Sequence, residues 1–413
     1  MLTPDAALRR ILDALRPRAP LQGERVPLAE ARGRALAEAV VAGRPSPPFD
    51  NASMDGYALR AADAPAPGAG LPVAFDVFAG APADRPLPPG ACCRIFTGAA
   101  IPPGADAVEM QEEVERRGRR AIFRRAAVKG RFVRAAGAEL REGAVALPRG
   151  AVVDAGAVGL LAALGRTEVA VHRRPRVAIL ATGSELVPVD GALRPGQIRD
   201  SNSHALAAAC REAGAEPTLL PIAGDEAEAL DRALAGAALA DVLLTSGGVS
   251  VGERDLVRPA LERAGFSLDF WRVAMRPGKP VAFGASPRAA VFGLPGNPAS
   301  ALVTFELFVR PALRALAGLP GNGRAVLPAR LAVPWAKPAG LTVFLRARAR
   351  VEAGALWVEP LATQESGHLT SVTGHQALAV LPAGAERLRR GARVSAILVA
   401  PPTLDPAAPS DLA

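Results

Sequence analysis

The chain has 413 residues, of which 50% are hydrophobic, and it carries a formal net charge of +9 at pH 7. This length predicts about two to four domains with buried cores, and no run of roughly 18 apolar residues could form a membrane-spanning helix. Aromatic residues make up only 4% of the chain and do not alternate with basic ones. The positive charge therefore favours a small polyanionic ligand over nucleic acid or a membrane surface.

Cysteines and histidines are few and show no metal-binding spacing. The chain has three cysteines, of which Cys92 and Cys93 are neighbours, and four histidines without an H-x-x-x-H pattern, which argues against a disulfide framework or a zinc site. We find no Walker A, G-x-S-x-G or strand-associated G-x-G-x-x-G motif. Because the N-terminus also lacks the regions of a signal peptide, we expect a cytoplasmic protein.

The first regular segment is predicted to be helical from Pro4 to about Leu36, since Ala7, Ile11 and Leu15 recur at helical spacing. A turn-rich passage then leads to 50–58, a polar stretch that contains Asp55 and the only tyrosine. Loops of this composition commonly carry function, although an Asx-turn network that ties a domain together would use the same residues.

A small β domain is predicted from Pro72 to about Val145, where short strand-like runs are separated by Pro and Gly. One of these runs ends at Thr97-Gly98, a turn that either binds an anion or simply ends the strand. Beyond this domain, 152–164 is predicted to be helical and 173–175 to be a linker.

Strand-like and helical segments alternate between Arg176 and Leu316. This alternation predicts an α/β domain with a mostly parallel sheet and ligands at the carboxyl ends of its strands. Polar turns are expected at three of these ends: 182–185, 246–250 and 295–297. In the middle turn, glycines would let backbone N–H groups approach a phosphate, and Asp255 would suit a hydrated cation. A plain loop with a capped helix would look the same.

Three cations fall in one strand-to-turn segment: Arg272, Arg276 and Lys279. They could clamp a phosphate or another oxyanion, but a solvated strand could carry the same charges.

After a glycine-rich linker near residue 320, the alternation over 326–399 predicts a second small β domain, with Ser371 in a polar turn. The Pro/Ala-rich end, from Ala400 onward, is predicted to be frayed.

Six motifs, in order along nearly the whole chain, closely resemble those of the molybdopterin molybdenumtransferases, the MoeA-type enzymes related to the gephyrin E domain. The motifs are Asp50–Ala58, Arg94–Ala99, Ala181–Leu186, Thr245–Asp255, Pro277–Pro280 and Gly293–Ser300. The resemblance implies a multidomain fold of α/β and β parts. Its expected divisions are an N-terminal helical/β segment (1–45 and 140–172), an inserted β domain (46–139), a molybdopterin-binding α/β domain (173–317), a C-terminal β domain (325–400) and a flexible tail (401–413).

The resemblance also implies a homodimer whose cleft is completed by the inserted domain of the partner subunit. The implied reaction takes molybdate and adenylylated molybdopterin, with Mg²⁺, to the molybdenum cofactor and AMP. Catalytic positions carried over from the family are Asp55, Thr97, Glu185, Asp225, Asp255 and Lys279, with Asp225 or Asp255 as the Mg²⁺ ligand. Substrate-binding positions carried over are Thr182, Gly183, Ser184, Ser246, Gly247, Gly248, Ser250, Arg272, Arg276, Pro295, Gly296, Asn297 and Ser371.

The sequence departs from the family pattern at Arg272 and Arg276, where lysines are common, and at 137–139 and Gln376.

Two other functions stay open. A molybdopterin adenylyltransferase would need little beyond 176–316, so the extra β domains argue against it. A non-catalytic scaffold of the gephyrin kind is disfavoured because no fused adenylyltransferase domain or long linker is present. An adenylyltransferase and molybdoenzyme acceptors are possible partners.

Overall fold

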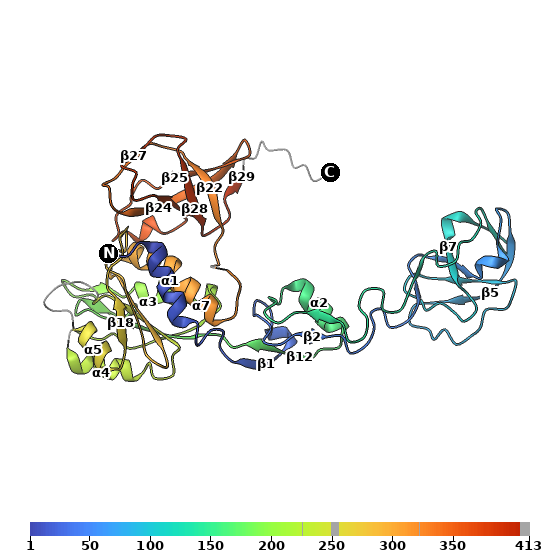
Figure 1. Cartoon of the computed structure of the whole chain (residues 1–413), viewed down its shortest axis with the longest axis horizontal. Coiled ribbons are helices and arrows are strands. Elements are labelled where there is room, and N and C mark those ends of the chain that lie inside the picture. The colour runs from blue at the N-terminus through green and yellow to red at the C-terminus, as the bar shows by residue number, and fades with distance from the viewer. Residues whose placement is uncertain (225, 249–255, 322, 405–413) are drawn as a thin grey trace. The chain divides into compact units, whose positions relative to one another are not determined.

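The computed structural model describes residues 1–224, 226–248, 256–321 and 323–404 (Figure 1). Asp225, Ser250 and Asp255 therefore lie outside the described residues. The chain groups into two compact units, one made of Met1–Val26, Ala31–Ala37 and the chain from Ala170 onward, the other of Pro27–Glu30 and Glu38–Val169. This grouping is coarser than the expected five-part division, which stays a prediction. Within the described ranges, no helix is both long and apolar enough to cross a bilayer.

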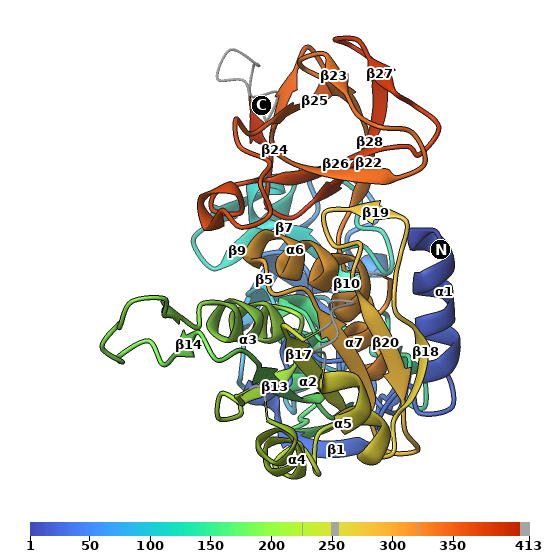
Figure 2. The same cartoon turned by 90° about the vertical axis from the view of Figure 1, so that its left-hand side faces the viewer.

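The first unit contains a six-stranded sheet in the order β16-β13-β17-β21-β20-β18 (Figure 2). The pairs from β16 to β21 are parallel, whereas β20 and β18 are antiparallel to their neighbours. The predicted α/β domain with a mostly parallel sheet is confirmed. Its strands are β13 (Arg176–Ala181), β16 (Glu216–Leu219), β17 (Val242–Ser246), β18 (Ser267–Phe270), β20 (Ala282–Ala285) and β21 (Ala290–Leu294).

Helices cover both faces of this sheet, because alternate strand residues point to opposite sides. Val177 and Ile179 of β13 pack with residues of α1, α3, α6 and α7, while Ala178 and Leu180 pack with residues of α4 and α5. The helices are α1 (Pro4–Leu15), α3 (Asn202–Glu212), α4 (Ala227–Ala235), α5 (Val257–Arg263), α6 (Pro298–Thr304) and α7 (Arg310–Leu316).

The last helical segment contains a π-turn, η4 (Phe305–Val309), between α6 and α7. Pro311 lies in the first turn of α7, and its ring has no N–H for the usual bond to the residue four positions earlier. A wider turn accommodates such a residue within a continuous helix. The chain is therefore helical from Pro298 to Leu316, with a local widening at η4.

The prediction that helix continues to Leu36 is wrong, since α1 ends at Leu15. Pro17 and Pro20 follow directly, and proline interrupts a helix by removing a donor and clashing with the preceding turn. Further on, β1 (Gly23–Pro27) pairs with β12 (Glu168–His172). Val26 is the only buried residue of β1, so pairing with a distant strand, rather than an apolar helical face, determines this segment.

The C-terminal part of the first unit is a ring of five strands, β24-β25-β22-β28-β26, closed by pairing of β26 with β24 (Figure 2). Closure leaves no free edge among these five strands, and the predicted second β domain is confirmed. Its elements are β22 (Val326–Leu331), β23 (Trp335–Ala336), β24 (Thr342–Glu352), β25 (Ala355–Pro360), η5 (Leu369–Ser371), β26 (Ala377–Leu381), β27 (Arg387–Leu388) and β28 (Arg393–Leu398).

Two short strands join this ring from other parts of the chain. β19 (Met275–Arg276) pairs with the start of β24, so Arg276 lies opposite Val343. β29 (Thr403–Leu404) pairs with the far end of β24. The expectation of a frayed chain from Ala400 is therefore wrong for these two residues, because a ladder partner is available to them.

The second unit contains a six-stranded sheet in the order β7-β4-β6-β5-β9-β8. Its core includes Tyr57 and Phe123, whose rings meet edge to face at 6.5 Å, which confirms the predicted small β domain. The elements of the unit are β2 (Val40–Val41), β3 (Asn51–Ala52), β4 (Gly56–Leu59), β5 (Gly70–Val77), β6 (Cys92–Ile95), β7 (Ala107–Met110), β8 (Val114–Arg117), β9 (Arg120–Phe123), β10 (Val133–Arg134), β11 (Val145–Leu147) and α2 (Ala155–Ala163).

Candidate active site

Three of the predicted polar turns lie side by side at one edge of the α/β sheet. They follow β13, β17 and β21, which are adjacent and parallel, so their carboxyl ends reach the same edge. The Thr182 N–H donates to the Ser246 carbonyl at 3.0 Å, and the Gly247 N–H donates to the Leu294 carbonyl at 3.1 Å. Backbone hydrogen bonds thus extend the sheet into the turns and fix their spacing.

Asn202, at the start of α3, holds two of these turns together. Its side-chain amide donates to the Ser246 hydroxyl at 2.8 Å and to the Gly296 carbonyl at 2.7 Å. Asn202 is buried, so its two hydrogen bonds are shielded from water and link the second turn to the third. Asn202 was not predicted from the sequence, although its place directly after Asp200-Ser201 and before an apolar helix is typical of a helix start.

Glycine is required at Gly247, because its φ is +93° and a Cβ there would lie 2.6 Å from the Thr182 carbonyl oxygen. One part of the prediction is wrong, however. We expected the Gly247 amide to face a phosphate, but it donates to the Leu294 carbonyl within the sheet. The nearby Thr182 hydroxyl is buried and has no partner among the described residues, so it is a free polar group at this edge.

A cavity of about 500 Å³ lies beside the third turn. Its cationic side chains are Arg276 and Lys279, both exposed, in the turn that follows β19. Asn297, at the N-terminus of α6, also lines it and donates its side-chain amide to the Ser366 hydroxyl at 2.8 Å. The cavity therefore brings together Arg276, Lys279, Pro295 and Asn297, four of the predicted positions.

A second cavity, of about 280 Å³, is lined by Arg276 and by Arg346 of β24. Only 1% of Arg346 is exposed, and its Nη2 donates to neutral oxygens, the Glu365 carbonyl and the Ser371 hydroxyl, each at 3.2 Å. Its Nε is buried without a partner. Burial, and then the nearby charge of Arg276, lower the pKa of Arg346 to about 10. It remains a buried cation without a carboxylate partner among the described residues.

A buried charge of this kind normally has a counter-ion. An anion in the smaller cavity would supply one, and guanidinium groups bind tetrahedral oxyanions well. Arg346 was not predicted from the sequence, although an arginine directly after the apolar run Val343–Leu345 and before Ala347 could have indicated it.

Ser371 is completely buried at the end of η5. Its hydroxyl donates to the His368 carbonyl at 2.6 Å and accepts from Arg346 at 3.2 Å. This predicted substrate-binding residue is therefore placed to position the Arg346 guanidinium.

Other predicted positions are more dispersed. Ser184 and Glu185 are exposed in the first turn, with the Glu185 carboxylate folded back over Gly183. Arg272 is exposed and does not line either cavity. Gly248 needs a left-handed backbone with φ of +63°, and the predicted residues Asp225, Ser250 and Asp255 lie outside the described ranges.

In the second unit, Asp55 and Thr97 are directly bonded. One carboxylate oxygen of Asp55, Oδ1, accepts from the Thr97 hydroxyl at 2.6 Å and from the Thr97 N–H at 2.7 Å. These two bonds, with the charge of Arg94, lower the pKa of the Asp55 carboxyl. Asp55 and Thr97, which were predicted from separate motifs, therefore form one hydrogen-bonded pair in which Thr97 orients the Asp55 carboxylate.

An aromatic surface adjoins this pair. Phe78 is 55% exposed and stacks on Phe96 with ring centroids 4.9 Å apart and planes inclined by 11°. The Arg94 guanidinium lies 4.8 Å from the Phe96 centroid. Phe96 precedes Thr97 directly, so a flat, exposed ring stack lies next to the Asp55 carboxylate.

The described residues contain no cluster of three or more His, Cys, Asp or Glu that could hold a metal ion. Mg²⁺ commonly uses one or two carboxylates together with substrate phosphates. Glu185 at the sheet edge, with a phosphorylated substrate, would fit that pattern.

Comparison with known proteins gives a consistent result over three regions. Family models match residues 2–165 (MoeA N-terminal region, domain I and II), 178–315 (probable molybdopterin binding domain) and 328–399 (MoeA C-terminal region, domain IV). The molybdopterin molybdenumtransferase of Bacillus subtilis is 36% identical over 96% of this chain and 93% of its own. That of Nostoc sp. is 44% identical over 72% of this chain and 70% of its own.

Solved structures agree with these matches. A crystal structure of the molybdopterin biosynthesis moeA protein from Pyrococcus horikoshii OT3 is similar to this chain with a TM-score of 0.81 and 31% identity. It covers 96% of this chain and 100% of the other. By sequence over its N-terminal, central and C-terminal regions and by structure over nearly its whole length, the chain belongs to the MoeA family.

Proposed function

We propose that the protein is a molybdopterin molybdenumtransferase, which inserts molybdenum from molybdate into adenylylated molybdopterin and releases AMP. The names of its relatives support this activity. The structural observation that carries the proposal is the pair of adjoining cavities lined by Arg276, Lys279 and Arg346, the larger of which lies beside the third turn of the α/β sheet.

The arrangement suits the charge changes of this reaction. Cleaving the pyrophosphate link develops negative charge on the leaving AMP phosphate, and Arg276 and Lys279 can stabilise it. Molybdate is a tetrahedral dianion, for which the buried guanidinium of Arg346, positioned by Ser371, is a suitable donor. Mg²⁺, bound at Glu185 and the substrate phosphates, would further neutralise the pyrophosphate oxygens.

The direct test is to incubate the purified protein with adenylylated molybdopterin, molybdate and Mg²⁺ and to measure AMP. We expect AMP release that depends on both molybdate and Mg²⁺. Activity with ATP and free molybdopterin instead would identify an adenylyltransferase, and binding without turnover would identify a scaffold. Either result would overturn the proposal.

The Asp55–Thr97 pair gives a pH prediction. The Thr97 hydroxyl favours the ionised form of Asp55, so in Thr97→Val the pKa of Asp55 should rise toward its ordinary value of 3.8. If the ionised carboxylate serves the reaction, the acid limb of the kcat/KM profile for AMP release should move to higher pH. Thr97→Ser, which keeps the hydroxyl, should retain the wild-type profile. An unchanged acid limb in Thr97→Val would argue against a role for ionised Asp55.

We also propose a homodimer, supported by the exposed apolar surface of the second unit. Helix α2 consists only of Ala, Gly, Val and Leu, yet just Ala157 and Leu161 are buried. Val145 in the neighbouring part of the unit is 56% exposed, and Val152 is 37% exposed. Apolar groups of this kind in one small region are typical of a surface that a partner covers.

Val145→Asp should therefore weaken the dimer, because it places a charge in an apolar interface. Light scattering coupled to gel filtration would report the mass. Val128→Asp is a matched control in the same unit, since Val128 is 52% exposed but lies in the β domain. If both variants keep the wild-type mass, this surface is not the interface.

A further inference from the structure

A third cavity, of about 250 Å³, lies in the first unit and shares no lining residue with the two cavities of the candidate site. Four segments that are distant in sequence line it: 32–34, 172–174, the end of α3 and the end of α7. Five arginines line it, namely Arg32, Arg34, Arg174, Arg211 and Arg314.

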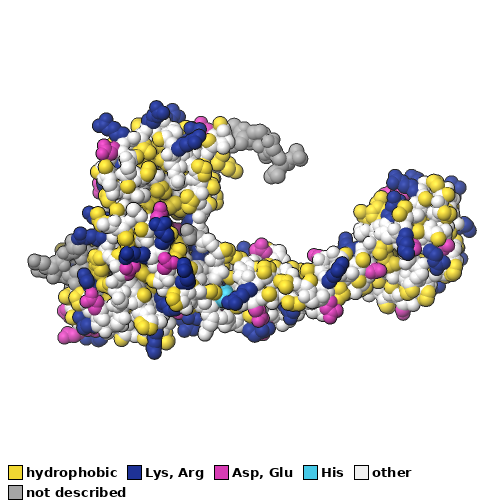
Figure 3. All heavy atoms as spheres, viewed as in Figure 1, with side chains coloured by type: hydrophobic (Ala, Val, Ile, Leu, Met, Phe, Trp, Pro, Cys, Tyr) yellow, Lys and Arg dark blue, Asp and Glu magenta, His cyan; other side chains and the backbone are white. Residues whose placement is uncertain are grey.

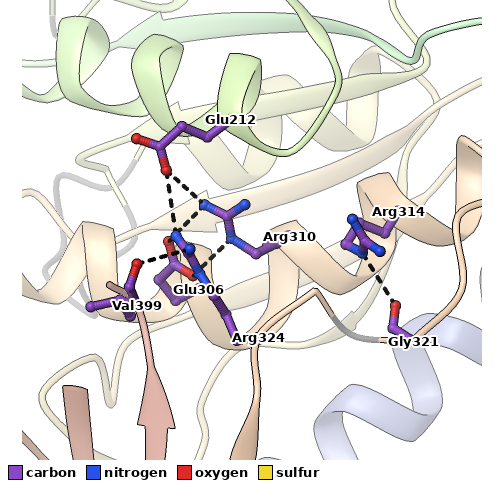
Figure 4. A network of polar contacts seen from close by, with 7 residues as sticks. All are labelled: Glu212, Glu306, Arg310, Arg314, Gly321, Arg324 and Val399. Atoms are coloured by element: carbon purple, nitrogen blue, oxygen red, sulfur yellow. Dashed lines mark hydrogen bonds and ion pairs between the residues drawn. The ribbon is translucent and has the colours of Figure 1, made fainter. Parts of the chain in front are cut away.

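The charge of four of these arginines is poorly balanced, whereas Arg34 forms an ion pair with Glu24. The only acid in the lining is Glu212, and Figure 4 shows its carboxylate directed at Arg310 and Arg324, to which it lies at 3.3 and 3.4 Å. In the part of the chain that the structure describes, no hydrogen bond or ion pair is recorded for the side chains of Arg32, Arg174 or Arg211. By contrast, the neighbouring Arg173 donates from its two terminal nitrogens to the two carboxylate oxygens of Asp241, at 2.7 and 2.6 Å.

Arg34 is the most buried of the five, with 8% exposed. Its Nη2 donates to the His172 carbonyl at 2.9 Å and to the Glu24 carboxylate, with which it forms an ion pair, but its Nε is buried without a partner among the described residues. A buried donor without a partner is costly. An anion oxygen in the cavity that Arg34 lines would provide the missing acceptor.

Arg314 bonds only to neutral groups. Its guanidinium donates to the Gly321 carbonyl at 3.4 Å (Figure 4) and to the Pro320 carbonyl at 2.7 Å. Burial, and then the charge of Arg310, lower its pKa, as is usual for a cation that lacks a counter-ion. Basic side chains are otherwise scattered over the face shown in Figure 3, whereas this cavity is lined by five arginines and a single acid, Glu212.

We propose that this cavity is a second anion site that binds a phosphate-class oxyanion of about the size of pyrophosphate, separate from the cleft that serves molybdenum insertion. Guanidinium groups bind phosphate oxygens in pairs of parallel hydrogen bonds. The volume equals about eight water molecules, which accommodates two linked tetrahedral groups. The bound anion would join segment 32–34 to α3 and α7 and so stabilise the first unit.

Inorganic pyrophosphate is the probe, used with the full-length protein. The test variant is Arg174→Gln/Arg211→Gln, since both residues are exposed and their loss should not disturb the fold. Arg9→Gln/Arg288→Gln is the matched control, because these exposed arginines lie outside the cavity. Lys279→Ala weakens anion binding in the candidate active site and so separates the two classes of site.

Calorimetric titration should give two classes of pyrophosphate site in the wild type and in the control. The test variant should lose one class, with affinity falling about tenfold or more per arginine, and should lose part of the rise in Tm that pyrophosphate causes. Lys279→Ala should keep that class. AMP release by the test variant should equal that of the control. The result of this titration therefore does not depend on whether the proposed function is correct.

Equal stoichiometry and equal Tm shifts in the test and control variants would overturn the proposal. It would also be overturned if the test variant binds pyrophosphate normally but forms a different oligomer, because the cavity would then receive an acidic side chain from a second copy.

Discussion

Replacing Arg346 by Met should lower the rate of AMP release by about a hundredfold or more, in the range for removing one partner of a buried charged contact. The same change should leave the free energy of unfolding unchanged or slightly higher. Arg346 is a desolvated cation with only neutral partners, and an apolar side chain of similar length removes that desolvation penalty. Loss of activity together with retained stability is what an anion-binding role requires.

Arg348→Met is the matched control, because Arg348 lies two residues further along β24 and is exposed. It should keep both activity and stability. The loss in Arg346→Met should be chiefly a higher KM for molybdate, with adenylylated molybdopterin still bound. If Arg346→Met instead unfolds at lower denaturant concentration while the remaining folded fraction is fully active, Arg346 is structural and the molybdate assignment fails.

Glu306→Ala should destabilise the protein by about 3–5 kcal/mol, the range for removing one partner of a buried ion pair. The Glu306 carboxylate binds Arg310 at 2.8 Å and Arg324 at 2.8 Å, and Arg324 also donates to the Val399 carbonyl at 2.9 Å (Figure 4). Without it, Arg310, which is 3% exposed, would keep only the solvent-exposed Glu212 as an acid partner. Chemical denaturation of the variant and the wild type measures the difference.

The same carboxylate makes the stability of the protein depend on pH in the acid range. Burial alone would raise the pKa of Glu306, but the hydrogen bonds and charges of Arg324 and Arg310 outweigh it and lower that pKa below its ordinary 4.5. The contribution of the ionised Glu306 carboxylate to the free energy of unfolding is therefore complete above about pH 4.5. It is lost as the pH falls through the pKa that Glu306 has in the folded protein. Glu306→Gln should show a weaker loss of stability in that acid range.

Glu262→Ala is the control for this series, since Glu262 pairs with Arg258 on the surface, where the two side chains are 51% and 60% exposed. Such pairs contribute about 0–1 kcal/mol. A destabilisation of Glu306→Ala no larger than that of Glu262→Ala would show that the buried network does not anchor the fold.

The parts of the fold that the sequence predicted well are those with a local signal. Ala7, Ile11 and Leu15 repeat at helical spacing and do lie on the buried face of α1. The three turns at the sheet edge could be placed together because parallel strands bring their carboxyl ends to the same side. Each of these predictions needs only residues that are near in sequence, together with one topological rule.

The residues that escaped prediction depend on distant partners. Arg346, Arg348 and Arg350 alternate along one strand with nearly the same local chemistry, yet only Arg346 is enclosed, because Ser371 and the Glu365 carbonyl pack against it. Likewise, nothing near Gly247 in sequence indicates that its amide bonds to Leu294. Long-range pairing of this kind is a property of the folded sheet rather than of a local pattern.

The pairing of β19 with β24 has a consequence for any attempt to isolate the α/β portion. Met275 and Arg276 pair with Thr342 and Val343 of the C-terminal ring. A protein shortened near Leu319 would therefore lose the strand that holds the start of the cationic turn, as well as Arg346 and Ser371. Such a fragment would retain its sheet and helices but not the geometry of Lys279. The minimal functional piece of this molecule therefore includes the ring.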